Sequence, residues 1–497
     1  MKMFFVKIFC RNLTRQGKFP IINIAGLSVG LAVVLLISAF VFNEFSFDRS
    51  FTHHKRIYRA NSEVSFMGNE GTMNVSTPAL ALAAKEEIPA VETAVRVQLH
   101  SAVVKAGESP FKVEKLCWVD HDFFSLFATP FIHGAPEDIF ARPDMVALSE
   151  SQAKLFFGDR VPVGEILSVG GKQYEVCAVY RDFPANSHFN GYQIIGHFMS
   201  AHQKWIYENP KWTNISGCET FCLLAPDADV TDVESVMQQL VDQNFETPFY
   251  QIRLQPLDKI HLYSKDFLVD KQISAYYGDI GRVKMFLLLA AIILLVACIN
   301  YMNLSTARAQ KRSKEIGVCK TLGEKRWEII LRLYSETGLL TFISFLSAFV
   351  LAWIMLPAFN LILGQNIPLG ILINAKFLAG MFLVYIVTTV IAASYPALYL
   401  SGFAPLTVIR QAVFTKGGSH ALVRKGLSVL QFSVAMILIA WIIVIQTQMN
   451  FVNSKDKGYD VQNVISISIP AQSVLDALKN DFLAQESVSE ASLRVFH

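Results

Sequence analysis

Five runs of predominantly apolar residues, separated by polar stretches, organise the chain. Each run holds about 20 residues, enough for a helix to cross the roughly 30 Å hydrocarbon core of a bilayer. The predicted spans are residues 20–42, 283–306, 337–359, 377–400 and 426–446. We therefore expect a membrane protein built around an α-helical transmembrane bundle.

A long polar stretch, residues 43–282, separates the first span from the second and contains no apolar run of span length. The alternation of polar and apolar positions in residues 172–179 is typical of a strand. Residues 149–157 and 230–244 instead show the periodicity of amphipathic helices. This mixture predicts one large extracytoplasmic domain of the α+β class, inserted between two spans.

The distribution of basic residues predicts the orientation of the spans. Residues 307–336 carry eight Lys or Arg, whereas the short loop 360–372 carries none. Short Lys/Arg-rich loops lie on the cytoplasmic side of a membrane. We expect the basic, amphipathic segment 1–19 and the linker 401–425 on that side as well. The N-terminus is then cytoplasmic, and residues 43–282 lie outside.

The basic loop 307–336 has helical periodicity of its own. Lys311 and Glu315 are four residues apart on a predicted helix, and Gly323 is placed to end that helix. The apolar positions expected on the buried faces of this helix and the next are Ile316, Cys319, Leu322, Trp327, Ile330, Leu331 and Tyr334. The residues alone leave two interpretations open: a positively charged anchor that only fixes topology, or a docking element for a cytoplasmic partner.

Composition and missing motifs exclude several classes of protein. With 52% hydrophobic and 17% charged residues, the 497-residue chain is too apolar for an ordinary soluble protein. It has no G-x-x-x-x-G-K-[ST] loop, so it is not itself an ATP motor. The apolar cores of the first, second, third and fifth spans lack charged residues, which disfavours an ion-coupled transporter or a channel. We expect no catalytic residues and no enzyme activity.

Histidine and cysteine residues do not form a recognisable set of metal ligands. Cys218 and Cys222 could form a disulfide outside the cytoplasm, but they lack the second pair or nearby histidine of a metal site. Histidines without a paired ligand at helical spacing are expected to have structural roles; these are His53, His54, His188 and His261. We expect no metal, no cofactor and no nucleic-acid partner.

Residues 300–340 resemble the hallmark segment of MacB/FtsX-type ABC transporter permeases. In that family, N-x-x-N-L-x-T-A is followed by R-x-x-E-I-G-x-x-K-x-x-G and by a segment ending in E-S or E-T. The matching positions are Asn300, Asn303, Leu304, Thr306, Ala307, Arg312, Glu315, Ile316, Gly317, Lys320, Gly323, Glu336 and Thr337. Cys319 and Glu324 depart from the pattern, because relatives usually carry Arg and Ala at these positions.

The resemblance favours the docking interpretation of the basic loop. It implies that the loop contacts a separate cytoplasmic ABC ATPase subunit, which binds the ATP. The residues implied in this coupling are Arg312, Glu315, Ile316, Gly317, Lys320 and Gly323.

Five segments of the predicted outer domain carry a second resemblance. They are similar to the periplasmic core domain of MacB-like permeases, in the form common in the Bacteroidetes-type branch: residues 47–60, 119–127, 147–165, 179–189 and 257–262. The segment 395–410 looks like the closing motif of an FtsX-like permease domain.

The end of the chain resembles the start of a second copy of this unit. Residues 447–497 follow the fifth span and would open a second extracytoplasmic domain. Members of this branch typically have eight spans, so the resemblance implies a chain truncated in its second repeat. A natural five-span protein with a small C-terminal cap is the alternative.

Three functions are compatible with these features. The first is the permease subunit of an ABC transporter in the inner membrane, in which ATP hydrolysis moves the periplasmic domain for export or extrusion of a peptide, lipoprotein or drug. A dimer of permeases or a hetero-pair, a periplasmic adaptor or outer-membrane partner, and membrane lipids are its expected associations. The second is an FtsX-like regulator that activates an envelope hydrolase. The third, a receptor with a passive anchor, leaves the basic loop unexplained.

Overall fold

The computed structural model describes residues 19–66, 69–198, 200, 210–213, 218–246, 248–268, 277–307, 309–401, 419–455, 479 and 481–485. The chain divides into two units, Met1–Ala435 and Met436–His497, which we describe separately. Nearly all of the predicted segment 1–19 lies outside the described residues. So do most of the linker 401–425 and most of residues 447–497.

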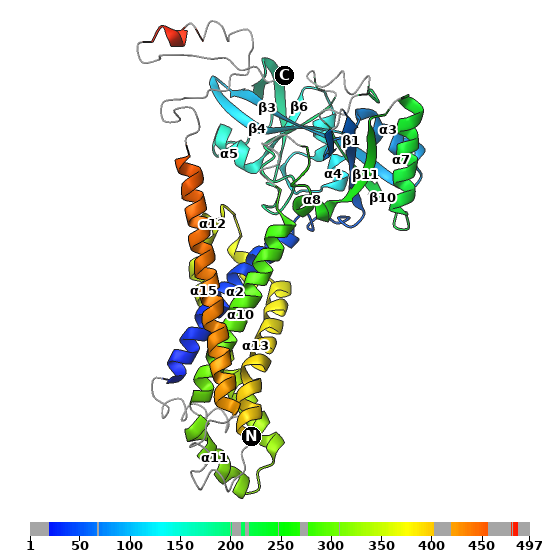
Figure 1. The fold of residues 1–497 in the computed structure, drawn as a ribbon. Coiled ribbons are helices and arrows are strands. Elements are labelled where there is room, and N and C mark those ends of the chain that lie inside the picture. The colour runs from blue at the N-terminus through cyan, green and yellow to red at the C-terminus, as the bar shows by residue number, and fades with distance from the viewer. Residues whose placement is uncertain are drawn as a thin grey trace. The chain divides into compact units, whose positions relative to one another are not determined.

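Among the described residues, five helices are long and apolar enough to cross a membrane (Figure 1). They are α2 (Phe19–Phe45), α10 (Ile280–Ala307), α12 (Arg326–Leu363), α13 (Ala375–Ser401) and α15 (Ser419–Ser454). Each contains one predicted span, but α12 already begins at Arg326, because the second half of the basic loop continues the helix. α13 contains Pro396 and continues beyond it to Ser401.

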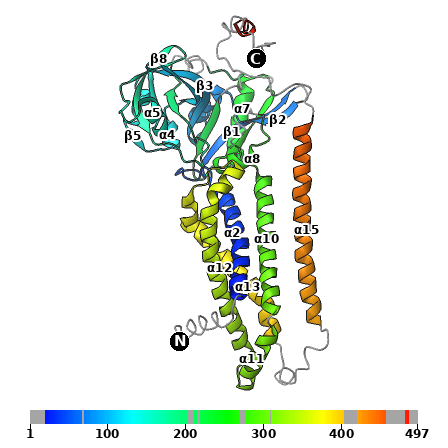
Figure 2. The same cartoon turned by 90° about the vertical axis from the view of Figure 1, so that its left-hand side faces the viewer.

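Helix α2 packs against α10, α12 and α13 in the first unit (Figure 2). Two glycines, Gly26 and Gly30, lie one turn apart on the side of α2 that contacts α10. A Cβ atom on Gly30 would lie 2.8 Å from Cβ of Ala297, and one on Gly26 would lie 3.2 Å from Nδ2 of Asn300. Small residues allow membrane helices to approach closely, and here the two glycines have that role.

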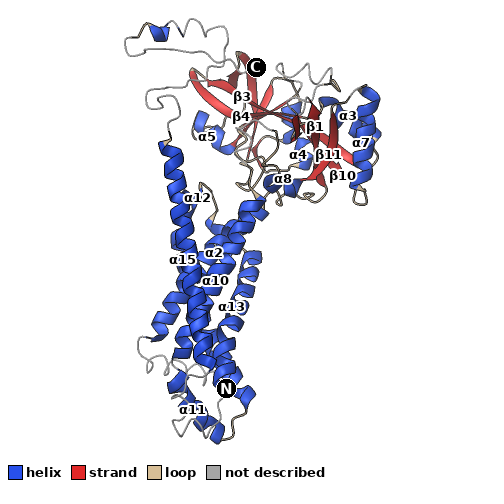
Figure 3. Ribbon diagram, viewed as in Figure 1, coloured by secondary structure: helices blue, strands red, loops and turns tan. Residues whose placement is uncertain are grey.

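The polar stretch between α2 and α10 folds around one mixed sheet (Figure 3). The strand order is β11-β1-β10-β3-β4-β9-β6-β8-β5, with β2 paired to β1, and β7 paired to β3 and β8. The strands are β1 (Ile57–Phe66), β2 (Asn69–Met73), β3 (Val91–Ala106), β4 (Ser109–Val119), β5 (Phe131–His133), β6 (Met145–Ser149), β7 (Ile166–Val169), β8 (Lys172–Tyr180), β9 (Ile194–His197), β10 (Glu219–Leu224) and β11 (Tyr250–Pro256). We call residues 46–268 the sheet domain.

Short helices cover the sheet, and three of them begin at a residue whose side chain caps the first turn. Thr77, Ser149 and Asp229 accept backbone N–H bonds at the first turns of their helices. The helices are α3 (Pro78–Glu87), α4 (Phe123–Leu126), η1 (Pro136–Phe140), α5 (Glu150–Phe157), α7 (Val230–Asn244) and α8 (Leu257–Tyr263). Helices α5 and α7 and strand β8 lie where the periodicity placed them. The α+β fold class is therefore confirmed.

The core of the sheet domain has three apolar clusters. α3 and α7 pack their apolar faces on β1, β10 and β11, with Met237 fully buried between them. A second cluster lies around Trp118 and Tyr174, and the third is rich in phenylalanine, centred on Phe127 and Phe189. The ring centroids of Phe127 and Phe189 lie 4.3 Å apart, and the two rings are tilted by 52°.

Candidate functional site

The basic loop forms a helical hairpin, which we call the coupling hairpin (residues 309–336). Its first helix, α11 (Ala309–Thr321), ends just before Gly323, as the sequence predicts. Gly323 has a φ of +96°, a conformation that favours glycine. The N–H of Gly323 donates to the carbonyl of Lys320 at 3.1 Å, and the N–H of Glu324 to that of Cys319 at 3.0 Å. These two bonds make a Schellman motif, which fixes the turn.

The second helix of the hairpin, α12, has a defined start. The backbone N–H of Lys325 donates to Oε2 of Glu328 at 2.8 Å, which satisfies one of the free donors at the helix end. Because α12 is one continuous helix, the hairpin and a predicted span share the same element.

The interior of the hairpin is apolar and includes the inner end of α13. Ile316 of α11 is buried against Ile329 and Leu333 of α12 and against Ala397 of α13; Ile330 and Tyr334 pack at the edge. The buried face of α12 was thus predicted correctly at Ile330 and Tyr334 and wrongly at Trp327 and Leu331. The buried residues of α12 at this end, Ile329 and Leu333, are those in the cluster with Ile316 of α11 and Ala397 of α13.

Two basic residues attach the hairpin to the end of α13. Nζ of Lys320 donates to the carbonyl of Ser401 at 2.7 Å, and Nε of Arg326 to Oγ of Ser401 at 3.4 Å. Arg332 also reaches Sγ of Cys319 at 3.7 Å. Lys320 therefore satisfies a free carbonyl at the C-terminal end of α13, where a cation is favourable.

Four large apolar side chains of the hairpin remain exposed. Leu322 is 82% exposed, Leu331 61%, Trp327 60% and Val318 56%. Leu322 directly follows α11, and its N–H donates to the carbonyl of Val318 at 3.1 Å, so these two residues lie on one side of the last turn. Trp327 and Leu331 are four residues apart and share one side of α12. We call these four residues the exposed apolar pairs. Sequence periodicity assigned three of them to buried faces, and only the packing with α13 shows that they point outward.

The six residues predicted to couple to an ATPase divide between surface and interior. Glu315 is exposed, Ile316 and Gly317 are buried, Lys320 is half-buried, and Gly323 forms the turn. The side chain of Arg312 lies outside the described part of the structure. Of the described residues in this set, Glu315 is the one that presents a side chain outward.

The other candidate sites among the described residues do not have the arrangement of a metal site or an active site. In the part of the chain that the structure describes, no group of three or more His, Cys, Asp or Glu is placed to hold a metal. Cys218 and Cys222 are both buried and free. The segment Gly26-Leu27-Ser28-Val29-Gly30 matches the letters G-x-S-x-G, but Ser28 lies within α2 and donates to the carbonyl of Ile24 at 2.6 Å. A nucleophile elbow requires a turn between a strand and a helix, so this match is not an active site.

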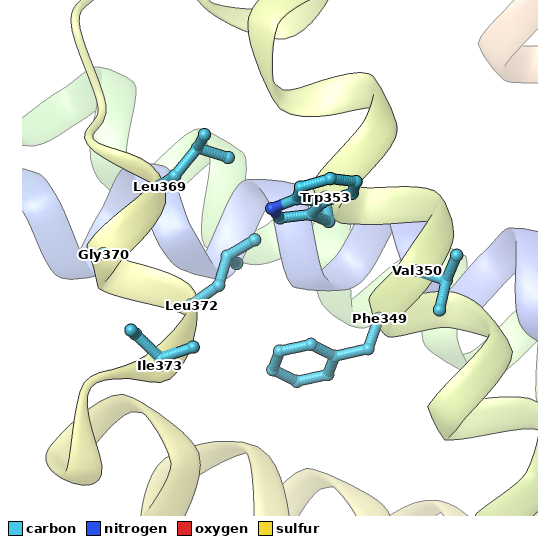
Figure 4. Close-up of a pocket in the computed structure, with 7 residues that line it drawn as sticks. All are labelled: Phe349, Val350, Trp353, Leu369, Gly370, Leu372 and Ile373. Atoms are coloured by element: carbon cyan, nitrogen blue, oxygen red, sulfur yellow. The ribbon is translucent and has the colours of Figure 1, made fainter.

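An apolar pocket of about 350 Å³ lies between α12 and the short helix η2 (Leu369–Ile373) (Figure 4). Its lining residues are Phe349, Val350, Trp353, Leu369, Gly370, Leu372 and Ile373. The lining has no charged group, and the pocket lies beside a helix that is apolar enough to cross a membrane.

Two protein families match this chain. Residues 21–240 match the MacB-like periplasmic core domain, and residues 287–405 match the FtsX-like permease C-terminal domain. The coupling hairpin lies within the second match, and most of the sheet domain lies within the first.

Three curated relatives are similar in sequence. An uncharacterized ABC transporter permease, YknZ of Bacillus subtilis, is 25% identical over 212 residues, 41% of this chain and 47% of its own length. The macrolide export ATP-binding/permease protein MacB of Bdellovibrio bacteriovorus is 22% identical over 268 residues, 54% of this chain and 38% of its own length. MacB of Agrobacterium fabrum is 23% identical over 283 residues, which are 55% of this chain and 39% of its own length. The chain thus spans less than half the length of these relatives.

Part of this chain is similar to two solved structures of bacterial proteins. A domain of a putative permease from Porphyromonas gingivalis has a TM-score of 0.36 and 18% identity, and covers 41% of this chain and 91% of its own. The periplasmic region of MacB from Actinobacillus actinomycetemcomitans has a TM-score of 0.31 and 12% identity. This match covers 42% of this chain and 91% of the solved chain. From the two family matches and the sequence relatives, we conclude that this chain belongs to the MacB/FtsX-type ABC transporter permeases.

Proposed function

We propose that this chain is a permease subunit that transmits the action of a separate cytoplasmic ATPase across the membrane to the sheet domain. The observation that carries the proposal is the set of exposed apolar pairs on the coupling hairpin. Large apolar side chains that point outward from a well-packed element are typical anchors of a protein interface. The ATPase would bind the nucleotide, and this chain would need no cofactor of its own.

The exposed apolar pairs are attached to two of the predicted spans, and this attachment supports transmission of movement across the membrane. Trp327 and Leu331 lie on α12 itself, and the hairpin is bonded to the end of α13 through Lys320 and Arg326. A displacement of the hairpin would therefore move both helices. We propose that this movement serves export or extrusion of an envelope substrate, in line with the names of the MacB relatives.

The docking surface is tested by reversing its polarity. In a Leu322→Glu, Trp327→Glu double variant, we expect recovery of the ABC ATPase subunit with the tagged protein to fall at least about tenfold, because two interface anchors are lost. The measurement is quantitative mass spectrometry of the complex purified from native membranes.

A matched control makes the same chemical change outside the hairpin. Leu155 and Val161 of the sheet domain are 60% and 58% exposed, so Leu155→Glu with Val161→Glu adds the same charge at similar exposure. We expect this control to retain the ATPase. Equal recovery from both variants would exclude the hairpin as the docking site.

The orientation in the inner membrane is a second part of the proposal. A cysteine placed at Glu108, which is exposed in the turn between β3 and β4, should react with a membrane-impermeant maleimide in cells with a permeabilised outer membrane. A cysteine at Leu322 should react only after the inner membrane is opened. Labelling of Leu322→Cys at the same rate as Glu108→Cys in such cells would contradict this topology.

A further inference from the structure

The sheet domain is attached to α2 through a residue of unusual backbone conformation, which the docking proposal does not use. Asp48, three residues after the end of α2, has a φ of +58°. Among the described residues it is the single residue other than glycine with a positive φ. Aspartate tolerates this conformation better than most residues, but the conformation is unfavourable and persists only where surrounding contacts fix it. The contacts around Asp48 must therefore supply that constraint.

Five hydrogen bonds tie the residues after α2 to the turn before β9. The backbone N–H of Asp48 donates to the carbonyl of Asn186 at 2.9 Å. Oδ1 of Asp48 accepts from Oγ of Ser187 at 3.1 Å and from the N–H of His188 at 2.7 Å. The side-chain amide of Asn186 donates to Oγ of Ser46 at 2.9 Å and to its carbonyl at 3.2 Å. Because Asp48 is fully buried, water does not compete for its bonds.

The turn before β9 is itself fixed to the core of the sheet domain. Phe189, which follows the turn, is fully buried in the phenylalanine-rich cluster. Phe51, from the segment after α2, belongs to the same cluster. Its ring centroid lies 5.9 Å from that of Phe189 and 5.2 Å from that of Phe127. The chain that leaves α2 is therefore held by polar contacts at Asp48 and by apolar contacts at Phe51.

A second attachment joins α8 of the sheet domain to the ends of α2 and α10 (Figures 1 and 2). Nε2 of His261 lies 3.2 Å from Oε2 of Glu44, and the His261 ring stacks on Phe47 at 3.4 Å. Gly278, two residues before α10, packs so closely that a Cβ atom would lie 2.6 Å from both of these polar atoms. Leu262 of α8 belongs to the apolar cluster of the long helices. These three elements therefore meet at one point.

The two attachments act on the two connections between the sheet domain and the long helices. The first fixes the residues after α2, and the second also fixes the segment before α10. Domains move relative to one another by default, and a hinge is a few residues that absorb large changes in φ and ψ. Here Asp48 and Gly278, which lie where such a hinge would be, are enclosed by contacts. A change of φ or ψ at Asp48 would break its hydrogen bonds, and a side chain at position 278 would overlap its neighbours.

We propose that Asp48 is a positioning residue in a rigid joint between the sheet domain and helices α2 and α10. Oδ1 of Asp48 fixes the direction in which the chain leaves α2, and Gly278 allows the close packing of the other connection. As a part of transmission, the joint rests on the proposed function. A tilt of α2 or α10 moves the sheet domain as one body and is not absorbed by the connections.

The distance distribution between two spin labels measures the rigidity of the joint. The labels are placed on cysteines at Glu108, in the turn between β3 and β4, and at Lys284 of α10, which are both exposed. Cys10 and Cys319 are replaced by serine, and the other five cysteines are buried and therefore unreactive. For the full chain in lipid nanodiscs, without any ATPase, we expect a single narrow distribution.

Two substitutions at Asp48 separate the acceptor oxygen from the backbone conformation. Asp48→Gly favours a positive φ but removes the acceptor, so we expect a distribution at least about twofold wider, as for domains on a free hinge. Asp48→Asn keeps an acceptor oxygen and tolerates a positive φ. Burial raises the pKa of Asp48, which favours its neutral form, so a neutral amide is a close substitute and should keep the wild-type width. Equal widths in the wild type and the glycine variant, or equal broadening in both variants, would overturn the assignment to Oδ1.

A matched control makes the same change outside the joint. Asp227→Gly alters an exposed aspartate in the turn before α7 and should leave the distribution unchanged. Protection of β3 and β4 against hydrogen exchange shows whether each variant keeps the fold of the sheet domain. If Asp48→Gly unfolds it, Ser187→Ala decides, because it removes one of the two donors to Oδ1. We expect this variant to broaden the distribution, and a wild-type width would refute the proposal.

The α10 side of the joint is tested by adding one methyl group. Gly278→Ala places a Cβ atom against Glu44 and His261, so we expect a shifted or broadened distribution. Gly380→Ala of α13 is the control, because no described atom lies within 4 Å of the position of its Cβ atom. An unchanged distribution in Gly278→Ala would remove this connection from the joint.

The joint and the docking surface can fail independently. The distance measurement contains no ATPase, so its result does not depend on binding at the coupling hairpin. The Leu322→Glu, Trp327→Glu variant should lose the ATPase and keep the narrow distribution. A broad distribution in this docking variant would contradict a joint that is independent of the hairpin.

Discussion

Arg59→Met is expected to destabilise the sheet domain by about 3–5 kcal/mol, the range seen when one member of a buried ion pair is removed. Arg59 is fully buried and donates to Glu219, Asn61, Tyr277, Gln255 and Ser264. Methionine fills a similar volume but leaves the Glu219 carboxylate without this cation. Thermal or urea unfolding of the purified chain, followed by circular dichroism, measures the change.

Arg253→Met is the matched control for this prediction. Arg253 lies on the adjacent strand β11, is 49% exposed and pairs with Glu63 and Glu234. Exposed ion pairs contribute at most about 1 kcal/mol, so we expect a small change. Equal losses in the two variants would show that the network around Arg59 adds nothing to stability.

The pH dependence of the Arg59 variant has a definite sign. The folded-state pKa of Glu219, about 2, lies below its ordinary value of 4.5. Its contribution to stability is therefore present above pH 4.5 and is lost as pH falls toward 2. Removing Arg59 should bring the folded-state pKa closer to 4.5, so the variant should lose less stability than the wild type over this interval.

Gly196→Val should destabilise the sheet domain by about 3 kcal/mol through overpacking. Gly196 of β9 lies opposite Trp118 of β4 in a parallel pair, and a Cβ atom would lie 2.4 Å from Cζ3 of the indole ring. Trp118 is fully buried, so its ring cannot swing into solvent. The same unfolding measurement applies.

A second substitution tests the cause of this effect. Trp118→Leu makes room at Gly196, so the two changes together should destabilise by clearly less than the sum of the single effects. Residues in contact commonly show such non-additivity. Strictly additive losses would mean that the valine acts elsewhere, for example on the contact with Val146.

Local sequence patterns predicted the elements of this fold well. Helices α5 and α7, strand β8 and the five long helices follow from short-range periodicity and from the length of apolar runs, which depend on neighbouring residues alone. Gly323 was also predictable, because a helix end needs a residue that tolerates a positive φ.

Contacts between distant segments could not be predicted in this way. The outward direction of Trp327 and Leu331 depends on α13, which follows far along the chain, and Ser401 gave no signal as the partner of Lys320. The histidines were expected to be structural, but their carboxylate partners Glu44 and Glu219 come from other elements. A single sequence does not show which strands become neighbours, so these two contacts were not predicted.

The length of α12 has a mechanical consequence. At 1.5 Å per residue, its 38 residues form a rod of about 57 Å that begins in the coupling hairpin. For a rigid rod pivoting at one end, a tilt of about 5° displaces the other end by roughly 5 Å, about the length of one helical turn. Such a lever would convert a small rotation at the hairpin into a stroke at its far end, without any change in the helix itself.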